Sequence, residues 1–332
     1  MIYPEKINKN DTIEIISPSN GVKSKKIKEL EKAIERLNSY GYKVVEDRYV
    51  RNTENGVSSS AFNRSIELNN AIQNKEIKAL FACSGGDYLV QIMDLISFDQ
   101  LKKNIKWIQG QSDITPLLFY ITTKLDIATI YSFNAKSFGN NNLPELMIEN
   151  NMEFLNGKMP KQIEYGYKID NDKIEQPWEC ITEDREFKGR IIGGCLDSLK
   201  DIIGTKYDCV KSFIKKYKDD GIIWYFDVAE MTNEDILRTM WQFKSAGWFI
   251  ACKGILFGRI ENEINYTGIT LKDAINYNLF DLNIPIFINT DIGHTNPVYT
   301  IINGSIVKVI KDKDNKHIMK TIFEWNINFL HL

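Results

Sequence analysis

The first 130 residues alternate between short apolar runs and segments with helical spacing. Runs at 12–16, 42–45 and 77–83 predict strands, and the segments 27–37 and about 60–73 predict amphipathic helices. Strands that alternate with helices favour right-handed βαβ units and therefore a parallel sheet. In such sheets, functional loops lie at the carboxyl ends of the strands.

The pattern changes twice along the rest of the chain. Between about 140 and 182 this alternation gives way to Asn, Glu and Lys with three prolines, which predicts a linker carrying some local helix. We therefore expect an N-terminal domain at 1–140, a linker at 141–182 and a C-terminal domain at 183–332. The C-terminal part mixes strands and helices, and Asn303-Gly304 between two apolar runs predicts a β-hairpin.

Composition excludes several classes of protein. Lys and Arg number 42 against 44 Asp and Glu, a net charge of -2, so no basic field for nucleic acid is expected. The five cysteines lack C-x-x-C spacing and a complete disulfide framework. The chain has no 18-residue apolar run, no signal-peptide core and no metal-ligand spacing. We expect a cytoplasmic protein without a membrane partner, metal or cofactor.

One serine occupies a position suited to a nucleophile. Trp107 to Gln109 predicts a buried strand end, Gly110 allows a sharp turn, and a helix pattern begins at Asp113. A serine between a strand and a helix is held on a tight elbow, and the helix N-terminus favours nearby negative charge. The alternative is that Ser112 only caps the helix.

An activated serine needs a base, an acid that orients the base, and N–H donors for the oxyanion. His294 is the only histidine in a glycine-flanked loop directly after a predicted strand. Asp227 closes a buried strand, and Glu230 follows it. Gly85-Gly86 follows another strand and could bring backbone amides close to a substrate. Each of these signals also has a structural interpretation, as a helix cap or a turn.

Six segments together resemble the LD-carboxypeptidase family of serine peptidases. They are Ser-Gly-Gly-Asp, Gly-Gln-Ser-Asp-Ile-Thr, Gly-Arg-Ile-Ile-Gly-Gly-Cys-Leu, Trp-Tyr-Phe-Asp-Val-Ala-Glu, Gly-Ile-Leu-Phe-Gly-Arg and Asp-Ile-Gly-His-Thr. The resemblance implies an α/β fold with a flavodoxin-like, parallel-sheet N-terminal domain and a smaller β-rich C-terminal domain, typically in a homodimer. It also implies that Ser112 is the nucleophile, with His294 and Asp227 completing the triad. The backbone amides of Gly86 and Asp113 would be the oxyanion donors.

The chain departs from the family pattern near the site. Asp227 stands where Glu is usual, which shortens the reach by roughly 1.5 Å, about one C–C bond. The backbone could compensate, a water could bridge, or Glu230 could substitute. Ser84 and Asp87 stand where Arg and Tyr are more usual, and Cys195 stands where Asn is common.

We expect a serine peptidase, most simply an LD-carboxypeptidase that releases a terminal D-amino acid from muropeptides. One alternative is a microcin-immunity type hydrolase of aminoacyl-nucleotide toxins, in which Trp178 would stack on a nucleobase instead of packing the linker. Another alternative is a non-catalytic ligand-binding relative. The expected substrate-binding residues are Gly85, Asp87, Trp178 and Glu230.

Overall fold

A parallel sheet organises the N-terminal half of the chain. The computed structural model describes residues 1–169 and 172–323. The sheet order is β14-β5-β4-β3-β1-β2, and β1 to β5 are mutually parallel. The order 2-1-3-4-5 is that of flavodoxin-like folds. The strands are β1 Thr12–Ile16, β2 Lys43–Glu46, β3 Ile77–Ala82, β4 Trp107–Gly110 and β5 Thr129–Tyr131.

The helices of this half follow the apolar periodicity of the sequence. In α1 (Ile27–Ser39), Leu30, Ala33 and Leu37 are buried at helical spacing. In α2 (Ala61–Gln73), the Ser60 hydroxyl caps the helix by accepting the Asn63 N–H at 3.2 Å. The remaining helices are α3 Phe98–Lys103 and α4 Thr115–Leu125.

The segment at 141–182, expected to be a linker with some local helix, is part of the folded structure. It holds α5 Glu145–Leu155 and the short strands β6 Lys161–Ile163, β7 Tyr167–Ile169, β8 Lys173–Glu175 and β9 Glu179–Cys180. Strand β6 pairs with β16, and β9 pairs with β13, at the two edges of the C-terminal sheet. Short edge strands face solvent, so their composition resembles that of a loop. The limits 1–140 and 183–332 remain predictions.

The C-terminal half is built on an eight-stranded mixed sheet of order β6-β16-β15-β10-β11-β12-β13-β9. Strands β10 to β13 are parallel. The strands not yet given are β10 Phe187–Cys195, β11 Ile222–Asp227, β12 Cys252–Gly258, β13 Ile286–Thr290, β14 Ile301–Asn303, β15 Ile306–Lys311 and β16 His317–Ile322. The helices are α6 Leu196–Leu199, α7 Val210–Tyr217, α8 Asn233–Ser245 and α9 Leu271–Leu279.

The hairpin prediction at Asn303-Gly304 was wrong. Strand β14 pairs with β5 of the N-terminal sheet, whereas β15 pairs with β10 and β16. The chain does turn there, because the Ser305 N–H donates to the Ile302 carbonyl at 3.1 Å. The strands before and after that turn enter different sheets, so the turn transfers the chain between the two halves.

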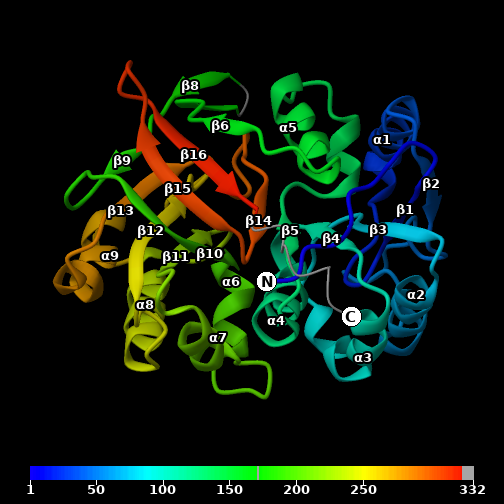
Figure 1. Ribbon diagram of the computed structural model, residues 1–332, viewed down its shortest axis with the longest axis horizontal. Helices are drawn as coiled ribbons and strands as arrows, with labels where there is room; N and C mark the ends of the chain where they lie inside the picture. The colour runs from blue at the N-terminus through cyan, green and yellow to red at the C-terminus, as the bar shows by residue number, and fades with distance from the viewer. Residues whose placement is uncertain (170–171, 324–332) are drawn as a thin grey trace, which may run out of the picture.

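One hydrophobic core extends through both sheets. It includes Ile108, Leu117 and Tyr131 together with Ile191, Tyr225 and Phe287. Figure 1 shows the two sheets on opposite sides of the molecule, with α4 near the middle, where it contacts α6, α7 and β10. No helix within the described ranges has both the length and the apolarity needed to cross a membrane.

Candidate active site

Ser112 forms the sharp turn between β4 and α4. Its φ is 70°, a left-handed conformation that costs a non-glycine residue about 1–3 kcal/mol and is common at functional sites. Gly110 does not make the turn. A Cβ at Gly110 would lie 2.8 Å from Ala82 Cβ, so this glycine allows close packing under the elbow. Ser112 makes no side-chain cap to α4, so the interpretation of Ser112 as a cap is wrong.

Neighbouring groups hold the elbow from both halves of the molecule. The Ser112 N–H donates to the Tyr131 hydroxyl at 3.2 Å, and the Thr115 hydroxyl donates to the Ser112 carbonyl at 2.7 Å. Thr115 Oγ1 also accepts the Cys195 N–H at 3.0 Å, and Cys195 belongs to the C-terminal sheet. These bonds offset the backbone cost of the strained serine.

The Gly-Gly loop after β3 lies against this elbow. A Cβ at Gly85 would be 2.8 Å from Ser112 Oγ, so any side chain at this position would collide with the serine. Gly86 has φ 149°, and a Cβ there would be 2.3 Å from Ser19 Oγ. The Asp113 carboxylate accepts the Ser19 hydroxyl and the Leu89 N–H, the latter at 2.9 Å. Asp113 thus joins the loops after β1 and β3 to the elbow.

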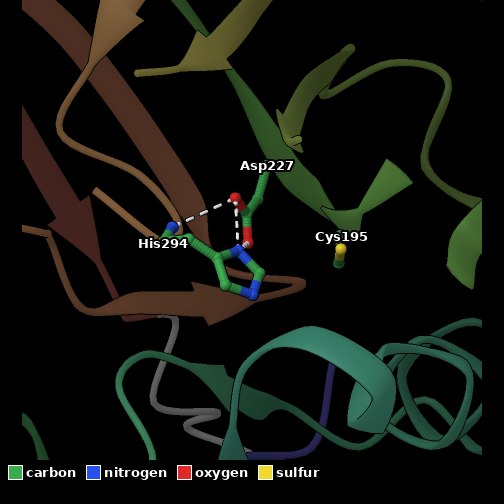
Figure 2. Close-up of side chains that lie close together, drawn as sticks. All are labelled: Cys195, Asp227 and His294. Atoms are coloured by element: carbon green, nitrogen blue, oxygen red, sulfur yellow. Dashed lines mark hydrogen bonds and ion pairs between the residues drawn. The ribbon is translucent and has the colours of Figure 1, made fainter. Parts of the chain in front are cut away.

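Asp227 and His294 form a bonded pair at the carboxyl ends of β11 and β13. His294 Nδ1 lies 3.0 Å from Asp227 Oδ1 and 2.8 Å from Oδ2, and the His294 backbone N–H donates to Oδ1 at 3.2 Å (Figure 2). The Tyr131 hydroxyl donates to Asp227 Oδ2 at 2.5 Å. Glu230 makes no hydrogen bond to His294 in the described chain, and its side chain is exposed.

Gly293 explains how an aspartate reaches the histidine. Its φ is 98°, and a Cβ at this position would lie 1.9 Å from Asp227 Oδ1. A residue without a side chain therefore allows the His294 loop to approach the carboxylate directly. The close approach of the backbone thus compensates for the shorter side chain of Asp227, without a bridging water or a substitution by Glu230.

The pair has coupled electrostatics. Burial alone raises the pKa of Asp227, but the charge and hydrogen bonds of His294 and the Tyr131 hydroxyl outweigh it, and the net pKa is lowered. Burial alone lowers the pKa of His294, but the Asp227 carboxylate outweighs it and the net pKa is raised. Asp227 is therefore held ionised beside an imidazole that binds a proton more readily than a free one.

A cavity of about 740 Å³ lies where the two halves meet. It is lined by Ser112 and His294 together with Gly85, Gly86, Asp87, Asp113 and Glu230. Asp227 lies behind His294 and is fully buried. Of the residues predicted at the site from the sequence, only Trp178 is absent from this region.

The expectation for Trp178 was wrong. Its side chain is only 5% exposed, its Nε1 donates to Asp291 Oδ2 at 2.7 Å, and its ring stacks on His317 with centroids 5.4 Å apart. The indole fills the core beneath β16, so it cannot stack on a ligand in the cavity.

Cys195 lies beside the histidine and acid. Cys195, Asp227 and His294 each offer one ligand atom, and these three atoms lie within 4.8 Å of one another (Figure 2). Among the described residues, this is the group whose spacing could hold a metal ion. A metal would have to displace the bonds between Asp227 and His294. Burial raises the pKa of the Cys195 thiol well above its usual value, which disfavours the thiolate that metals prefer.

Sequence reasoning missed two residues near the site. Tyr131 ends β5 and joins Ser112 to Asp227, and Lys136 follows β5 and lines the cavity. Their only signal in the sequence is their position. Both lie at or just after the end of β5, which pairs with β4, the strand that leads to Ser112.

The fold and the site define a class of α/β protein in which a strained serine and a histidine–aspartate pair meet between two β-sheets. The family models of the LD-carboxypeptidase N-terminal and C-terminal domains match residues 13–132 and 188–309. The chain belongs to the LD-carboxypeptidase family of peptidases.

Individual relatives are distant but full-length. A Vibrio cholerae protein named "Putative carboxypeptidase" is 26% identical over 98% of this chain and 99% of its own. The microcin C7 self-immunity protein MccF of Escherichia coli is 25% identical over 87% of each chain. A structure of MccF in complex with aspartyl sulfamoyl adenosine has a TM-score of 0.81 over 97% of this chain and 99% of that one, at 22% identity. A muramoyltetrapeptide carboxypeptidase from Oxalobacter formigenes has a TM-score of 0.74 over 93% of this chain and 98% of that one, at 20% identity. At these identities the structures establish the fold.

The first prediction concerns the His294 ring. We expect NMR titration to give His294 a pKa above the ordinary value of about 6.5. Asp227→Asn should lower that pKa, because it removes the negative charge that favours the protonated ring. A pKa unchanged by Asp227→Asn would contradict the coupling.

The second prediction concerns Asp227→Glu, which restores the common family residue. Because Gly293 and Tyr131 already contact the carboxylate, the added methylene should overpack the site and lower the free energy of unfolding by about 1–3 kcal/mol. Denaturant unfolding measures this, with the exposed Glu230→Asp as the control. A variant as stable as the parent would contradict this prediction and would show that the loop carrying Gly293 and His294 moves to accommodate the longer side chain.

Proposed function

We propose that this protein is a serine peptidase in which Ser112 is the nucleophile, His294 the general base and Asp227 the acid that orients it. The observation that carries the proposal is the strained elbow of Ser112 in the same cavity as a histidine whose Nδ1 is bonded to a buried aspartate. With Nδ1 held by Asp227, Nε2 is the nitrogen free to take the serine proton. In Figure 2 this nitrogen points away from Asp227.

The reaction would proceed through an acyl-enzyme. His294 takes the Ser112 proton as Oγ attacks the scissile carbonyl, and the imidazolium then protonates the leaving amine. Water attacks the acyl-enzyme with the same histidine as base. The backbone amides of Gly86 and Asp113, which line the cavity, are proposed to stabilise the oxyanion. No hydrogen bond joins the Ser112 hydroxyl to His294 in the described residues, and such bonds often form only when substrate binds.

The proposed substrate is a small peptide ending in a D-amino acid, as in a muropeptide. The family and the carboxypeptidase relatives support this substrate. The nucleotide-toxin alternative loses the residue expected to stack on a nucleobase, because Trp178 is buried and does not line the cavity. Strain at Ser112 argues against a non-catalytic relative, because such strain persists where function requires it. A cytoplasmic location and a homodimer belong to the same proposal.

The decisive experiment offers two substrates to the purified protein. A muropeptide tetrapeptide and an aminoacyl-sulfamoyl adenosine are incubated separately, and the products are identified by mass spectrometry. We expect loss of the terminal D-amino acid from the tetrapeptide. Cleavage of only the adenosine compound would favour the alternative, and cleavage of neither would contradict the peptidase proposal.

The third prediction tests the serine and histidine as one unit. Ser112→Ala and His294→Ala should each reduce kcat by roughly 10³-fold or more, and the double variant should be scarcely worse than either single variant. The thermal midpoint of Ser112→Ala should be nearly unchanged, because the hydroxyl is not a packing group. Multiplicative losses in the double variant would show that the two residues act independently.

The fourth prediction concerns Tyr131 as a positioning residue. Tyr131→Phe removes the hydroxyl that donates to Asp227 and accepts the Ser112 N–H, so kcat should fall about 10- to 100-fold while KM changes little. With one donor fewer, Asp227 should favour protonated His294 more strongly. The acid limb of kcat/KM should therefore move to higher pH, because the base must be neutral.

Tyr225→Phe is the matched control. Tyr225 is also fully buried, and its ring centroid is 5.4 Å from that of Tyr131, but its hydroxyl donates to Asn303 at 2.8 Å. We expect this variant to lose stability without the shift of the acid limb. The same shift in both variants would mean that Tyr131 has only a structural role.

A further inference from the structure

Lys136 is a cation in the cavity that the proposed reaction does not use. It lies in the short 3-10 helix Ala135–Gly139 just after β5, at the same edge of the sheet as Ser112. Its side chain lines the cavity, and Nζ donates to the Ser84 hydroxyl at 2.7 Å. This places a positive charge beside the Gly-Gly loop.

The ammonium group has no carboxylate partner among the residues that the structure describes. Lys136 forms no ion pair within the described residues, whereas Lys26, which also lines the cavity, is paired with Glu29. The residue is partly buried, and burial lowers the pKa of its ammonium group. A cation removed from water is costly unless an anion or several acceptors compensate it. One neutral hydroxyl compensates Lys136 only in part, so an anionic ligand would stabilise it.

Ser84 supplies a second donor at the same point. The side chain is 7% exposed and lines the cavity. Because Ser84 Oγ accepts from Lys136, its own hydrogen remains free to donate. The next residue, Gly85, lies so near Ser112 that a Cβ on it would be 2.8 Å from Ser112 Oγ. A group bound by Ser84 and Lys136 would therefore lie close to the proposed nucleophile.

The charges of the two cavity walls differ. The N-terminal half contributes every lysine of the lining (Lys23, Lys25, Lys26 and Lys136) together with Asp87 and Asp113, whereas the C-terminal half contributes Asp197, Asp201, Glu230 and Glu261. An anion would be repelled by the acidic wall and attracted to the basic one. The excess of lysines on the N-terminal side therefore favours placing an anionic group of the substrate near Lys136.

We propose that Lys136 and Ser84 bind the free carboxylate of the substrate's terminal amino acid, and so select for cleavage next to a chain end. The inference rests on the proposed peptidase function and assigns a specificity to it. The ammonium ion and the hydroxyl would each donate one hydrogen bond to the carboxylate. In the amino acid that leaves, the carboxylate is one carbon from the scissile nitrogen, which agrees with a subsite adjoining Gly85 and Ser112.

The test compares a tetrapeptide with a free C-terminal carboxylate and the same peptide as its carboxamide. For Lys136→Met, kcat/KM for the free acid should fall about 10- to 100-fold, the range expected for a lost hydrogen bond to a charged group. The carboxamide should be nearly unaffected, and Lys136→Arg should recover part of the preference. Lys103→Met, at an exposed lysine outside the cavity, is the control. Equal losses for both peptides, or no loss for the free acid, would overturn the assignment.

A second measurement separates this subsite from the peptidase proposal. The Ser112→Ala variant is treated with an amine-acetylating reagent with and without inorganic phosphate, and acetylation is quantified by peptide mass spectrometry. We expect phosphate to protect Lys136 but not Lys103. If phosphate protects Lys136 in this variant but the parent protein hydrolyses neither peptide, only the peptidase proposal is refuted. Equal acetylation of Lys136 with and without phosphate would refute the anion subsite.

Discussion

A buried phenol joins the two halves of the site. The Tyr131 hydroxyl accepts the Ser112 N–H at 3.2 Å and donates to Asp227 Oδ2 at 2.5 Å. Ser112 follows a strand of one sheet and Asp227 ends a strand of the other. The Tyr131 hydroxyl therefore links the Ser112 turn to the Asp227 carboxylate. In a nearly dry environment, an unpaired carboxylate or hydroxyl would cost several kcal/mol, on the order of the full desolvation penalty. The geometry is therefore favoured because each of these groups needs the other.

The remaining contacts act on the same junction. Thr115 bonds to the Ser112 carbonyl and to the Cys195 N–H, which ties α4 to the end of β10. Gly293 removes the side chain that would separate Asp227 from the His294 loop. Strand β14 belongs to the C-terminal part of the sequence but pairs with β5 of the N-terminal sheet, where Ile301 lies opposite Tyr131. The two sheets are thus held together by backbone pairing, by a shared core and by the polar groups of the site itself.

This arrangement leaves the cavity polar, with all of its lining lysines on one side. Ser112, the lining lysines, Asp87 and Asp113 belong to the N-terminal half. His294, Asp227 and the lining carboxylates Asp197, Asp201, Glu230 and Glu261 belong to the C-terminal half. In the proposed reaction, the substrate contacts both halves. A small displacement between the sheets would alter the distance from His294 to Ser112 and the hydrogen bond from Tyr131 to Asp227.

The sequence alone determined the parallel sheet of the N-terminal half and the positions of Ser112, Asp227 and His294 at or just after the ends of strands. These follow from local periodicity and turn residues, which act over a few neighbouring positions. Only the tertiary structure decided that β14 joins the other sheet, that 141–182 supplies edge strands, and that Trp178 is buried. It alone revealed Tyr131 and Lys136, because a residue's partner across two sheets leaves no pattern in its own segment. Long-range pairing depends on which buried polar groups and apolar faces meet in space, and that is settled when the two halves pack together.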